Sequence, residues 1–281
     1  MSYTVEIDWL ADHLQNENIR IIDCRFDLSN PSWGREQYKQ GHIPNALYFD
    51  LNIDLSKEIT THGGRHPLPD MELFVEKLAD AGIQEDTTVV AYDSQNGAMA
   101  SRLWWMLTYL GHTKTYILNG GYPAWEKKQL PITAQIPVFT KKSFVAYPKH
   151  QLLVSMEDVK ERIEKQADFY LIDSREQRRY EGAEEAIDKK AGHIPTALHY
   201  FWKDGVTDEG YLKSSEEQEE RFHKLDKTKE VIVYCGSGVT ACPNVLALKT
   251  AGFEQVKLYS GSWSDWISYE DNPVEKSSNL E

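Results

Sequence analysis

The hydrophobic residues of this chain fall into short runs separated by longer amphipathic stretches. Runs rich in β-branched or aromatic residues, typical of buried strands, occur at residues 21–23, 89–93 and 116–118 in the first half. Between them, residues 71–81 and 98–110 place apolar side chains at helical spacing. Strands that alternate with helices predict a mostly parallel sheet flanked by helices, so we expect an α/β fold.

The second half of the chain repeats motifs of the first half in the same order. The matched pairs are residues 21–25 and 171–175, the Gly-His-Ile-Pro motifs 41–44 and 192–195, residues 89–93 and 231–235, and residues 120–125 and 261–266. A period of this length indicates two whole domains rather than a solenoid of short repeats.

We therefore predict two tandem domains, 1–131 and 152–281, joined by a linker at 132–151. The linker contains Pro137 and Pro148 and has no helical periodicity, but its apolar residues indicate that it lies against a surface.

Composition narrows the possible partners. The chain has 281 residues, which suits two domains, and its formal net charge is −13. Because that charge repels polyanions, we expect no nucleic-acid partner and no membrane partner. The first residues lack the pattern of a signal peptide, and three cysteines are too few for a disulfide scaffold. These features predict a cytoplasmic protein, and without a Cys/His cluster at zinc-like spacing we expect no metal and no cofactor.

The strongest chemical signal is Cys235. It follows the buried run 231–234 and begins the loop Cys-Gly-Ser-Gly-Val-Thr, after which residues 245–251 are predicted to be helical. This order places the thiol at the carboxyl end of a strand and beside a helix N-terminus, where free backbone N–H groups and the helix dipole favour a thiolate. Cys24 and Cys242 lack this setting and are interpreted as packing residues. A phosphatase loop would need an arginine at Ala241, so phosphoryl transfer is disfavoured.

The Cys235 loop, the paired Gly-His-Ile-Pro motifs and the Gly-Ser-Trp motif near the C-terminus resemble those of the tandem-rhodanese sulfurtransferases, in particular the branch that uses 3-mercaptopyruvate. The resemblance covers nearly the whole chain and implies two rhodanese-like domains. It also implies an inactive first domain, because Asp93 stands at the position of Cys235 and cannot carry a persulfide.

The resemblance implies that Cys235 takes sulfur from 3-mercaptopyruvate as a persulfide, releases pyruvate and passes the sulfur to a thiol acceptor such as thioredoxin. The N–H groups of the loop residues Gly236, Gly238, Val239 and Thr240 are expected to stabilise the bound anion. The loop carries no cation to pair with a sulfonate, which favours an α-keto thiol over thiosulfate. A thiosulfate sulfurtransferase and a non-catalytic binding module remain the alternatives.

The resemblance also implies a Ser-His-Asp group that moves a proton. Its members would be Ser237 of the loop, with His66 and Asp54 from the first half of the sequence. His62 competes for the histidine position, and a loop histidine without a catalytic role is an equal alternative.

Arg179 matches the arginine by which the family binds its substrate, and a guanidinium suits a carboxylate. A second arginine of the family, expected shortly before the second Gly-His-Ile-Pro motif, is missing. Lys189 or Lys190 is expected to take its place as a point charge. Arg175, whose counterpart is Arg25 in the inactive half, is interpreted as part of a structural ion pair.

Overall fold

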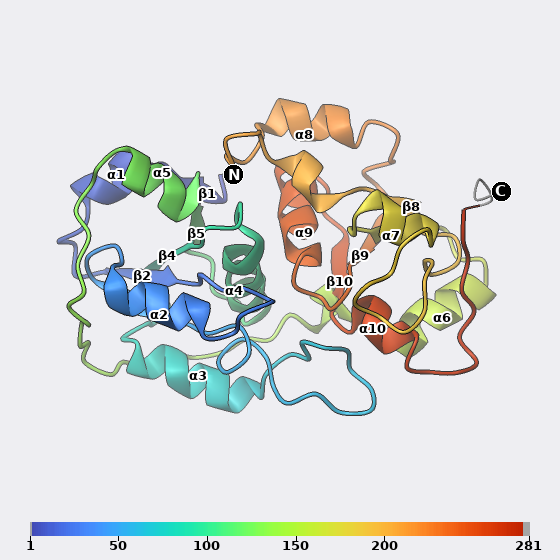
Figure 1. Ribbon diagram of the computed structural model, residues 1–281, viewed down its shortest axis with the longest axis horizontal. Helices are drawn as coiled ribbons and strands as arrows, with labels where there is room; N and C mark the ends of the chain where they lie inside the picture. Colours follow the sequence, from blue (N-terminus) through green and yellow to red (C-terminus); the bar gives the residue numbers. More distant parts are fainter. Residues whose placement is uncertain (1, 278–281) are drawn as a thin grey trace. The chain divides into compact units, whose positions relative to one another are not determined.

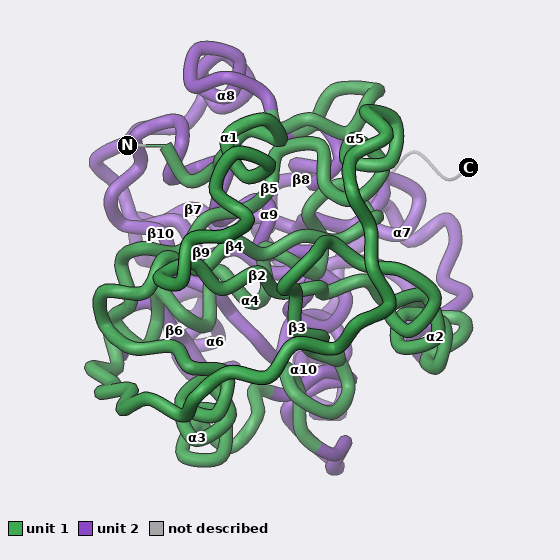
Figure 2. Tube along the Cα trace, turned by 90° about the vertical axis from the view of Figure 1, so that its left-hand side faces the viewer, with its two compact units in different colours: residues 1–57, 68–149, 206–212 green, residues 58–67, 150–205, 213–281 purple. Residues whose placement is uncertain are grey.

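The computed structural model describes residues 2–277. The chain forms two compact units (Figure 2), of which unit 1 comprises residues 1–57, 68–149 and 206–212 and unit 2 comprises residues 58–67, 150–205 and 213–281. Two short segments therefore belong to the opposite half of the molecule from their neighbours in sequence. Residues 58–67 are part of unit 2, and residues 206–212 are part of unit 1.

Unit 1 contains a five-stranded parallel sheet with the strand order β1-β5-β4-β2-β3 (Figure 1). Its strands are β1 (Thr4–Val5), β2 (Ile19–Asp23), β3 (Ala46–Tyr48), β4 (Thr88–Tyr92) and β5 (Thr115–Leu118). Its helices are α1 (Ile7–Asp12), α2 (Trp33–Gln40), α3 (Met71–Asp80), α4 (Ala98–Tyr109) and α5 (Gly121–Lys127).

Unit 2 repeats this sheet in the order β6-β10-β9-β7-β8. Its strands are β6 (Leu153–Val154), β7 (Phe169–Asp173), β8 (Leu198–His199), β9 (Glu230–Tyr234) and β10 (Val256–Tyr259). Its helices are α6 (Met156–Glu164), α7 (Gln177–Glu181), α8 (Ser215–Arg221), α9 (Ala241–Thr250) and α10 (Ser262–Trp266), with short 3-10 turns η1 (His150–Leu152) and η2 (Trp202–Gly205). The prediction of a parallel sheet flanked by helices in each half is confirmed.

The central strands of both sheets are buried on both faces. In unit 1, α1 and α5 pack together (Figure 1) and bury Ile21 and Val90 on one face, while α4 lies against β4 and β5. In unit 2, α6 and α10 bury Leu171 and Ile232 on one face, while α9 lies against β9 and β10. Burial on both faces explains why β4 and β9 are apolar runs after their first residue rather than alternating apolar and polar residues.

Local sequence chemistry fixes where several helices begin. The side chain of Asp70 accepts hydrogen bonds from two backbone N–H groups at the start of α3. Ser155 and Asp158 form a reciprocal capping box at the start of α6, as Ser214 and Glu217 do for α8.

The predicted linker region follows the surface of unit 1 up to residue 149. Thr133 forms a bridge with His42, and the backbone N–H groups of Lys142 and Tyr147 donate to Ala79 and Leu110. These backbone hydrogen bonds hold the segment against the unit although it has no helix or strand.

Candidate active site

Cys235 lies directly after β9, at the carboxyl end of a central strand, and is almost fully buried. Its backbone N–H donates to Ser262 Oγ at 3.1 Å, and its carbonyl accepts from the N–H of Trp263 at 2.9 Å. The loop that begins with Cys235 is therefore attached at its base to the start of α10, which fixes the direction of the thiol.

The backbone of the loop contacts the sulfur. The N–H of Gly238 points at Cys235 Sγ, with the two atoms 3.2 Å apart. Gly238 has a φ of +79°, and a Cβ at this position would lie 2.1 Å from the carbonyl oxygen of Ser260. Only glycine fits such a position, so this turn and its N–H contact depend on Gly238. The Cys242 thiol donates to the Gly238 carbonyl at 3.4 Å, which gives that cysteine a supporting contact.

The rest of the loop leads into α9, which begins at Ala241 rather than near Val245 as the sequence pattern predicts. Val239 is buried and Thr240 is the residue before the helix. Pro243 falls in the first turn of α9, where its missing N–H costs no helical hydrogen bond. The start of a ten-residue helix thus lies close to the thiol.

Ser237 and His66 are brought together, although they are far apart in sequence. Ser237 Oγ lies 2.8 Å from His66 Nδ1, and both side chains are buried. The segment that carries His66 is anchored within unit 2. Gly64 has a φ of +81° and lies so close to Gly261 that a Cβ would be 2.4 Å from its carbonyl oxygen. The pair has the geometry of a hydroxyl and imidazole that exchange a proton.

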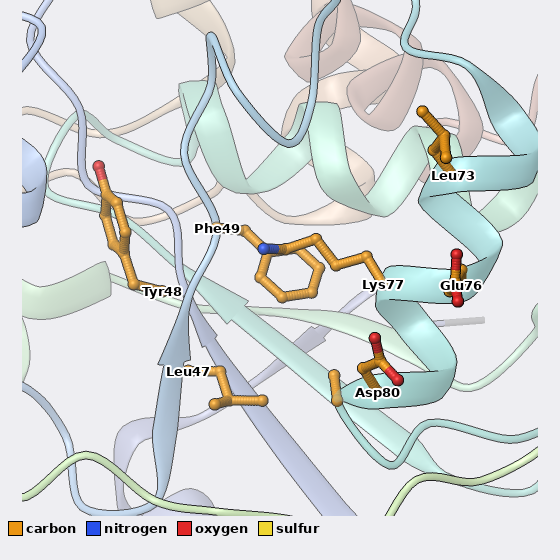
Figure 3. Close-up of a pocket in the computed structure, with 8 residues that line it drawn as sticks. Leu47, Tyr48, Phe49, Leu73, Glu76, Lys77 and Asp80 are labelled. Carbon is orange, nitrogen blue, oxygen red and sulfur yellow. The ribbon is translucent and has the colours of Figure 1, made fainter.

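Asp54, the expected third member of this group, belongs to unit 1. Its Oδ1 lies 2.7 Å from Lys77 Nζ, and its Oδ2 accepts from the backbone N–H of Asp50 at 2.7 Å. Figure 3 shows Lys77 extending across the ring of Phe49, with the ammonium 4.7 Å from the ring centre. Lys77 and Phe49 line an open hollow of about 370 Å³, together with the exposed Leu73. Within unit 1, Asp54 is thus held by a lysine and a turn.

Arg179 lies in α7 with its side chain mostly buried. Its Nε donates to both carboxylate oxygens of Glu185 at 3.0–3.1 Å, and its Nη2 donates to Asp188 Oδ2 at 2.8 Å. A Cβ built on Gly236 would lie 3.5 Å from Nη1 of Arg179. The structure therefore brings this predicted substrate residue next to the residue that follows the cysteine.

A second guanidinium, from Arg65, lies beside Arg179, and the sequence interpretation missed it. Arg65 Nη1 donates to Asp188 Oδ1, and Nη2 lies 2.9 Å from a Cβ built on Gly236. Burial, and next the positive charge of Arg179, lower the pKa of Arg65. The predicted substitutes differ in their settings: Lys189 is exposed, and Lys190 is half-buried with its carbonyl accepting from the indole of Trp263.

The arginine that follows each strand end, Arg25 in unit 1 and Arg175 in unit 2, forms the same buried ion pair in both units. Arg175 forms a buried fork with Asp173, and Arg25 does the same with Asp23, with the shortest contact 2.6 Å in each pair. Burial works against the charge of Arg175, but Asp173 outweighs it and raises the pKa of the guanidinium. The same ion pair occurs in unit 1, where Asp93 replaces the candidate nucleophile. We therefore interpret the pair as a structural contact that holds the end of the strand.

Asp93 takes the place of the cysteine in unit 1, and its side chain fills the loop. Its two carboxylate oxygens accept hydrogen bonds from four backbone N–H groups at 2.8–2.9 Å, those of Gln95, Gly97, Met99 and Ala100. Burial raises the pKa of Asp93, and these four donors oppose that change. Burial, and next the charge of Asp93, also raise the pKa of the Cys24 thiol, which disfavours a thiolate there.

The model of the rhodanese-like domain family matches the chain twice, at residues 6–128 and 155–269. The chain belongs to the rhodanese family. Its relatives include a probable 3-mercaptopyruvate sulfurtransferase of Pseudomonas aeruginosa, 39% identical over 94% of this chain and 95% of that protein. Others are the 3-mercaptopyruvate sulfurtransferase of Escherichia coli K12, at 35% identity over 98% of both chains, and the thiosulfate sulfurtransferase of Cricetulus griseus, at 32% identity over 94% and 91%.

Solved structures of rhodanese-family enzymes have the same arrangement of strands and helices. A 3-mercaptopyruvate sulfurtransferase structure from Escherichia coli aligns with a TM-score of 0.82 at 33% identity, over 94% of this chain and all of the other. The 3-mercaptopyruvate sulfurtransferase from Leishmania major aligns with a TM-score of 0.83 at 29% identity, over 94% of this chain and 73% of the other. In the residues that the structure describes, no helix is long and apolar enough to span a membrane.

Proposed function

We propose that this rhodanese-family protein is a sulfurtransferase that moves sulfur from 3-mercaptopyruvate to a thiol through a persulfide on Cys235. The proposal rests on the surroundings of the Cys235 thiol. The N–H of Gly238 lies 3.2 Å from Sγ, and the loop that contains both residues connects the carboxyl end of β9 to the start of α9. These are the conditions under which a cysteine is both nucleophilic and able to hold an anionic sulfur.

The proposed chemistry has two steps. The Cys235 thiolate attacks the sulfur of 3-mercaptopyruvate, the carbon–sulfur bond breaks, and its electron pair stays on the carbon as pyruvate enolate. Protonation of that carbon gives pyruvate, and the Ser237–His66 pair supplies a route for the proton released by the substrate thiol. An acceptor thiolate then attacks the outer sulfur of the persulfide, which restores the Cys235 thiolate.

The acceptor in this proposal is a thiol such as thioredoxin, and the reaction takes place in the reducing cytoplasm. Cys24, Cys235 and Cys242 are buried and form no disulfide, which fits such a compartment.

The experiment that tests the function is incubation with 3-mercaptopyruvate, followed by assay of pyruvate and by mass spectrometry of the cysteine-containing peptides. The expected result is pyruvate release together with one added sulfur on Cys235, both lost in Cys235→Ser and both retained in the control Cys24→Ala. Full pyruvate release by Cys235→Ser would show that another group is the nucleophile. Absence of reaction in the wild type would favour a binding module.

Thiosulfate sulfurtransferase is the second candidate, because relatives of that name align over most of the chain. Against it, residues 236–240 are uncharged, so the loop has no cation of its own for a sulfonate. A comparison of kcat/KM for 3-mercaptopyruvate and thiosulfate decides between the two, and a clear preference for thiosulfate would overturn the proposed donor.

A further inference from the structure

We infer that Asp265 is a positioning residue for the Ser237–His66 pair, because it fixes the segment that carries His66, residues 58–67, to the helix that also holds the Cys235 loop. This role rests on the proposed function, in which the pair moves a proton during the attack on 3-mercaptopyruvate. Asp265 itself has no part in the bonds that form and break.

Two side chains of α10 accept backbone N–H groups from the His66 segment. The N–H of Gly63 donates to Asp265 Oδ1 at 2.6 Å, and the N–H of Arg65 donates to Ser264 Oγ at 3.1 Å. Asp265 is 5% exposed, so its carboxylate forms this hydrogen bond away from water, where a charge-assisted bond is strong. The segment is thus attached to α10 on both sides of Gly64.

The His66 segment needs such attachment because its backbone is intrinsically flexible. Gly63 and Gly64 have φ angles of +98° and +81°, and residues 58–67 contain no helix or strand. Glycine enters this region of φ without strain but loses more conformational freedom than other residues when it is ordered. The two α10 acceptors bind the N–H groups that lie three residues and one residue before His66.

The first turn of α10 also holds the loop of the nucleophile. Ser262 Oγ accepts the N–H of Cys235 at 3.1 Å, and the N–H of Ser264 donates to the carbonyl of Gly236 at 3.0 Å. Ser264 therefore binds the loop through its backbone and the His66 segment through its hydroxyl. A single helical turn sets the position of the segment relative to the loop.

The second oxygen of the Asp265 carboxylate fixes the carboxylate itself. Oδ2 accepts the hydroxyl of Tyr259 at 2.7 Å, and Tyr259 ends β10. The carbonyl of Tyr259 in turn accepts the hydroxyl of Ser262 at 2.9 Å. One oxygen of Asp265 is thus bound to a strand end, and the other is directed at Gly63.

The duplicated turn of unit 1 is built without these hydrogen-bonding side chains. In the alignment of residues 120–125 with 261–266, the corresponding residues are Gly121 for Ser262, Pro123 for Ser264 and Ala124 for Asp265. Gly121 and Ser262 have nearly the same φ, +58° and +57°, so the backbone turn is common to both units. The turn therefore forms without the side chains, which occur in the unit that contains Cys235 and His66.

The first experiment measures the attachment by hydrogen–deuterium exchange of the peptide that contains residues 58–67. Asp265→Ala should speed its exchange about 10- to 100-fold, the range for loss of a charge-assisted hydrogen bond. Asp265→Asn keeps an acceptor for the N–H of Gly63 and should remain closer to wild type. The matched control Tyr259→Phe removes only the other hydrogen bond of the carboxylate and should change the exchange less than about twofold.

The second experiment tests whether the attachment acts through His66. Asp265→Ala should lower kcat/KM for 3-mercaptopyruvate about 10-fold, mainly through kcat, and should affect thiosulfate less, since thiosulfate has no thiol proton. In a His66→Gln background the same change should cost less than about twofold, because the residue that it positions is already lost. Tyr259→Phe should leave the ratio of the two donors unchanged even if its melting temperature falls.

Unchanged exchange of the 58–67 peptide in Asp265→Ala would overturn the inference, as would additive losses in the double variant or equal losses with both donors. If Asp265→Ala does not fold, Ser264→Ala tests the same attachment, because it removes the acceptor for Arg65 and keeps the backbone N–H that binds Gly236. If exchange responds as expected but the wild type releases no pyruvate, the placement of the segment stands and the proposed function fails.

Discussion

His66 Nδ1 lies 2.8 Å from Ser237 Oγ in the loop that begins with Cys235. A residue of the first half of the sequence thus forms a hydrogen bond with the loop of the second half. Both residues belong to unit 2, where the segment 58–67 is part of the compact structure. The contact gives a reason for the loop to carry a hydroxyl where a dianion-binding loop would carry a cation.

Removal of this hydroxyl should affect one donor more than the other. 3-Mercaptopyruvate has a thiol proton to lose, and thiosulfate has none. Ser237→Ala is therefore expected to lower kcat/KM for 3-mercaptopyruvate by about 10²-fold or more and to affect thiosulfate less. His66→Gln should follow the same pattern, and the exposed His62, in His62→Gln, is the matched control. Equal losses with both donors would remove the proton-transfer role.

Two glycines of one loop should respond differently to the same change. Gly238→Ala puts a side chain at a φ of +79° and against the Ser260 carbonyl, so we expect a lower melting temperature and loss of activity. Gly236 does not have a positive φ, and a methyl group there would meet the end of the Arg65 side chain. Gly236→Ala should therefore keep its melting temperature but raise KM for 3-mercaptopyruvate. A similar loss of stability in both variants would contradict this distinction.

The buried ion pair of unit 1 should matter for stability. Arg25→Ala leaves Asp23 buried without its guanidinium, which is expected to lower the free energy of unfolding by about 3–5 kcal/mol. The matched control is Arg35→Ala, since Arg35 is half-exposed and 3.6 Å from Asp50 and should cost less than about 1 kcal/mol. Urea unfolding measures both. Equal effects would mean that the Arg25–Asp23 pair adds no more than a surface contact.

Asp93 should give unit 1 a pH-dependent stability. Because burial raises the pKa of Asp93 in the folded protein, its contribution is complete below the unfolded pKa of about 3.9 and is lost as pH rises through the folded pKa. The free energy of unfolding of wild type, relative to Asp93→Asn, should therefore fall with pH above about 4 and then become constant. A difference that grows with pH would mean that the four N–H donors outweigh burial.

The sequence predicted the parts of the fold that local pattern determines. The strand before Cys235 is a continuous apolar run because β9 is covered on both faces, and the duplication of motifs corresponds to two sheets with the same strand order. α9 begins at Ala241, before the predicted helical stretch 245–251, and includes Pro243 in its first turn, the part of a helix that tolerates a proline.

The sequence did not predict which cationic side chain lies beside Arg179. The sequence predicts Lys189 or Lys190 as the second cation, because these residues lie in the segment where the family has an arginine. The cation beside Arg179 is Arg65, which is joined to it through Asp188 by contacts distant in sequence. Its position next to His66 was the available signal, because a residue beside a predicted catalytic histidine is carried to the same place. No pattern of spacing shows that a single carboxylate will bind two such arginines.

The side chain of Asp93 has a consequence for the intermediate of the other half. Its oxygens are two bonds beyond Cβ, the same number of bonds that separate the outer sulfur of a persulfide from the Cβ of its cysteine. In the proposed reaction, unit 2 holds an anion at this place only while Cys235 is a persulfide. In unit 1 the carboxyl group of Asp93 is always at the corresponding place and accepts from four backbone N–H groups. The carboxyl group of Asp93 in unit 1 therefore corresponds in position to the persulfide proposed for Cys235 in unit 2. Because it is part of the side chain, it cannot be transferred to an acceptor.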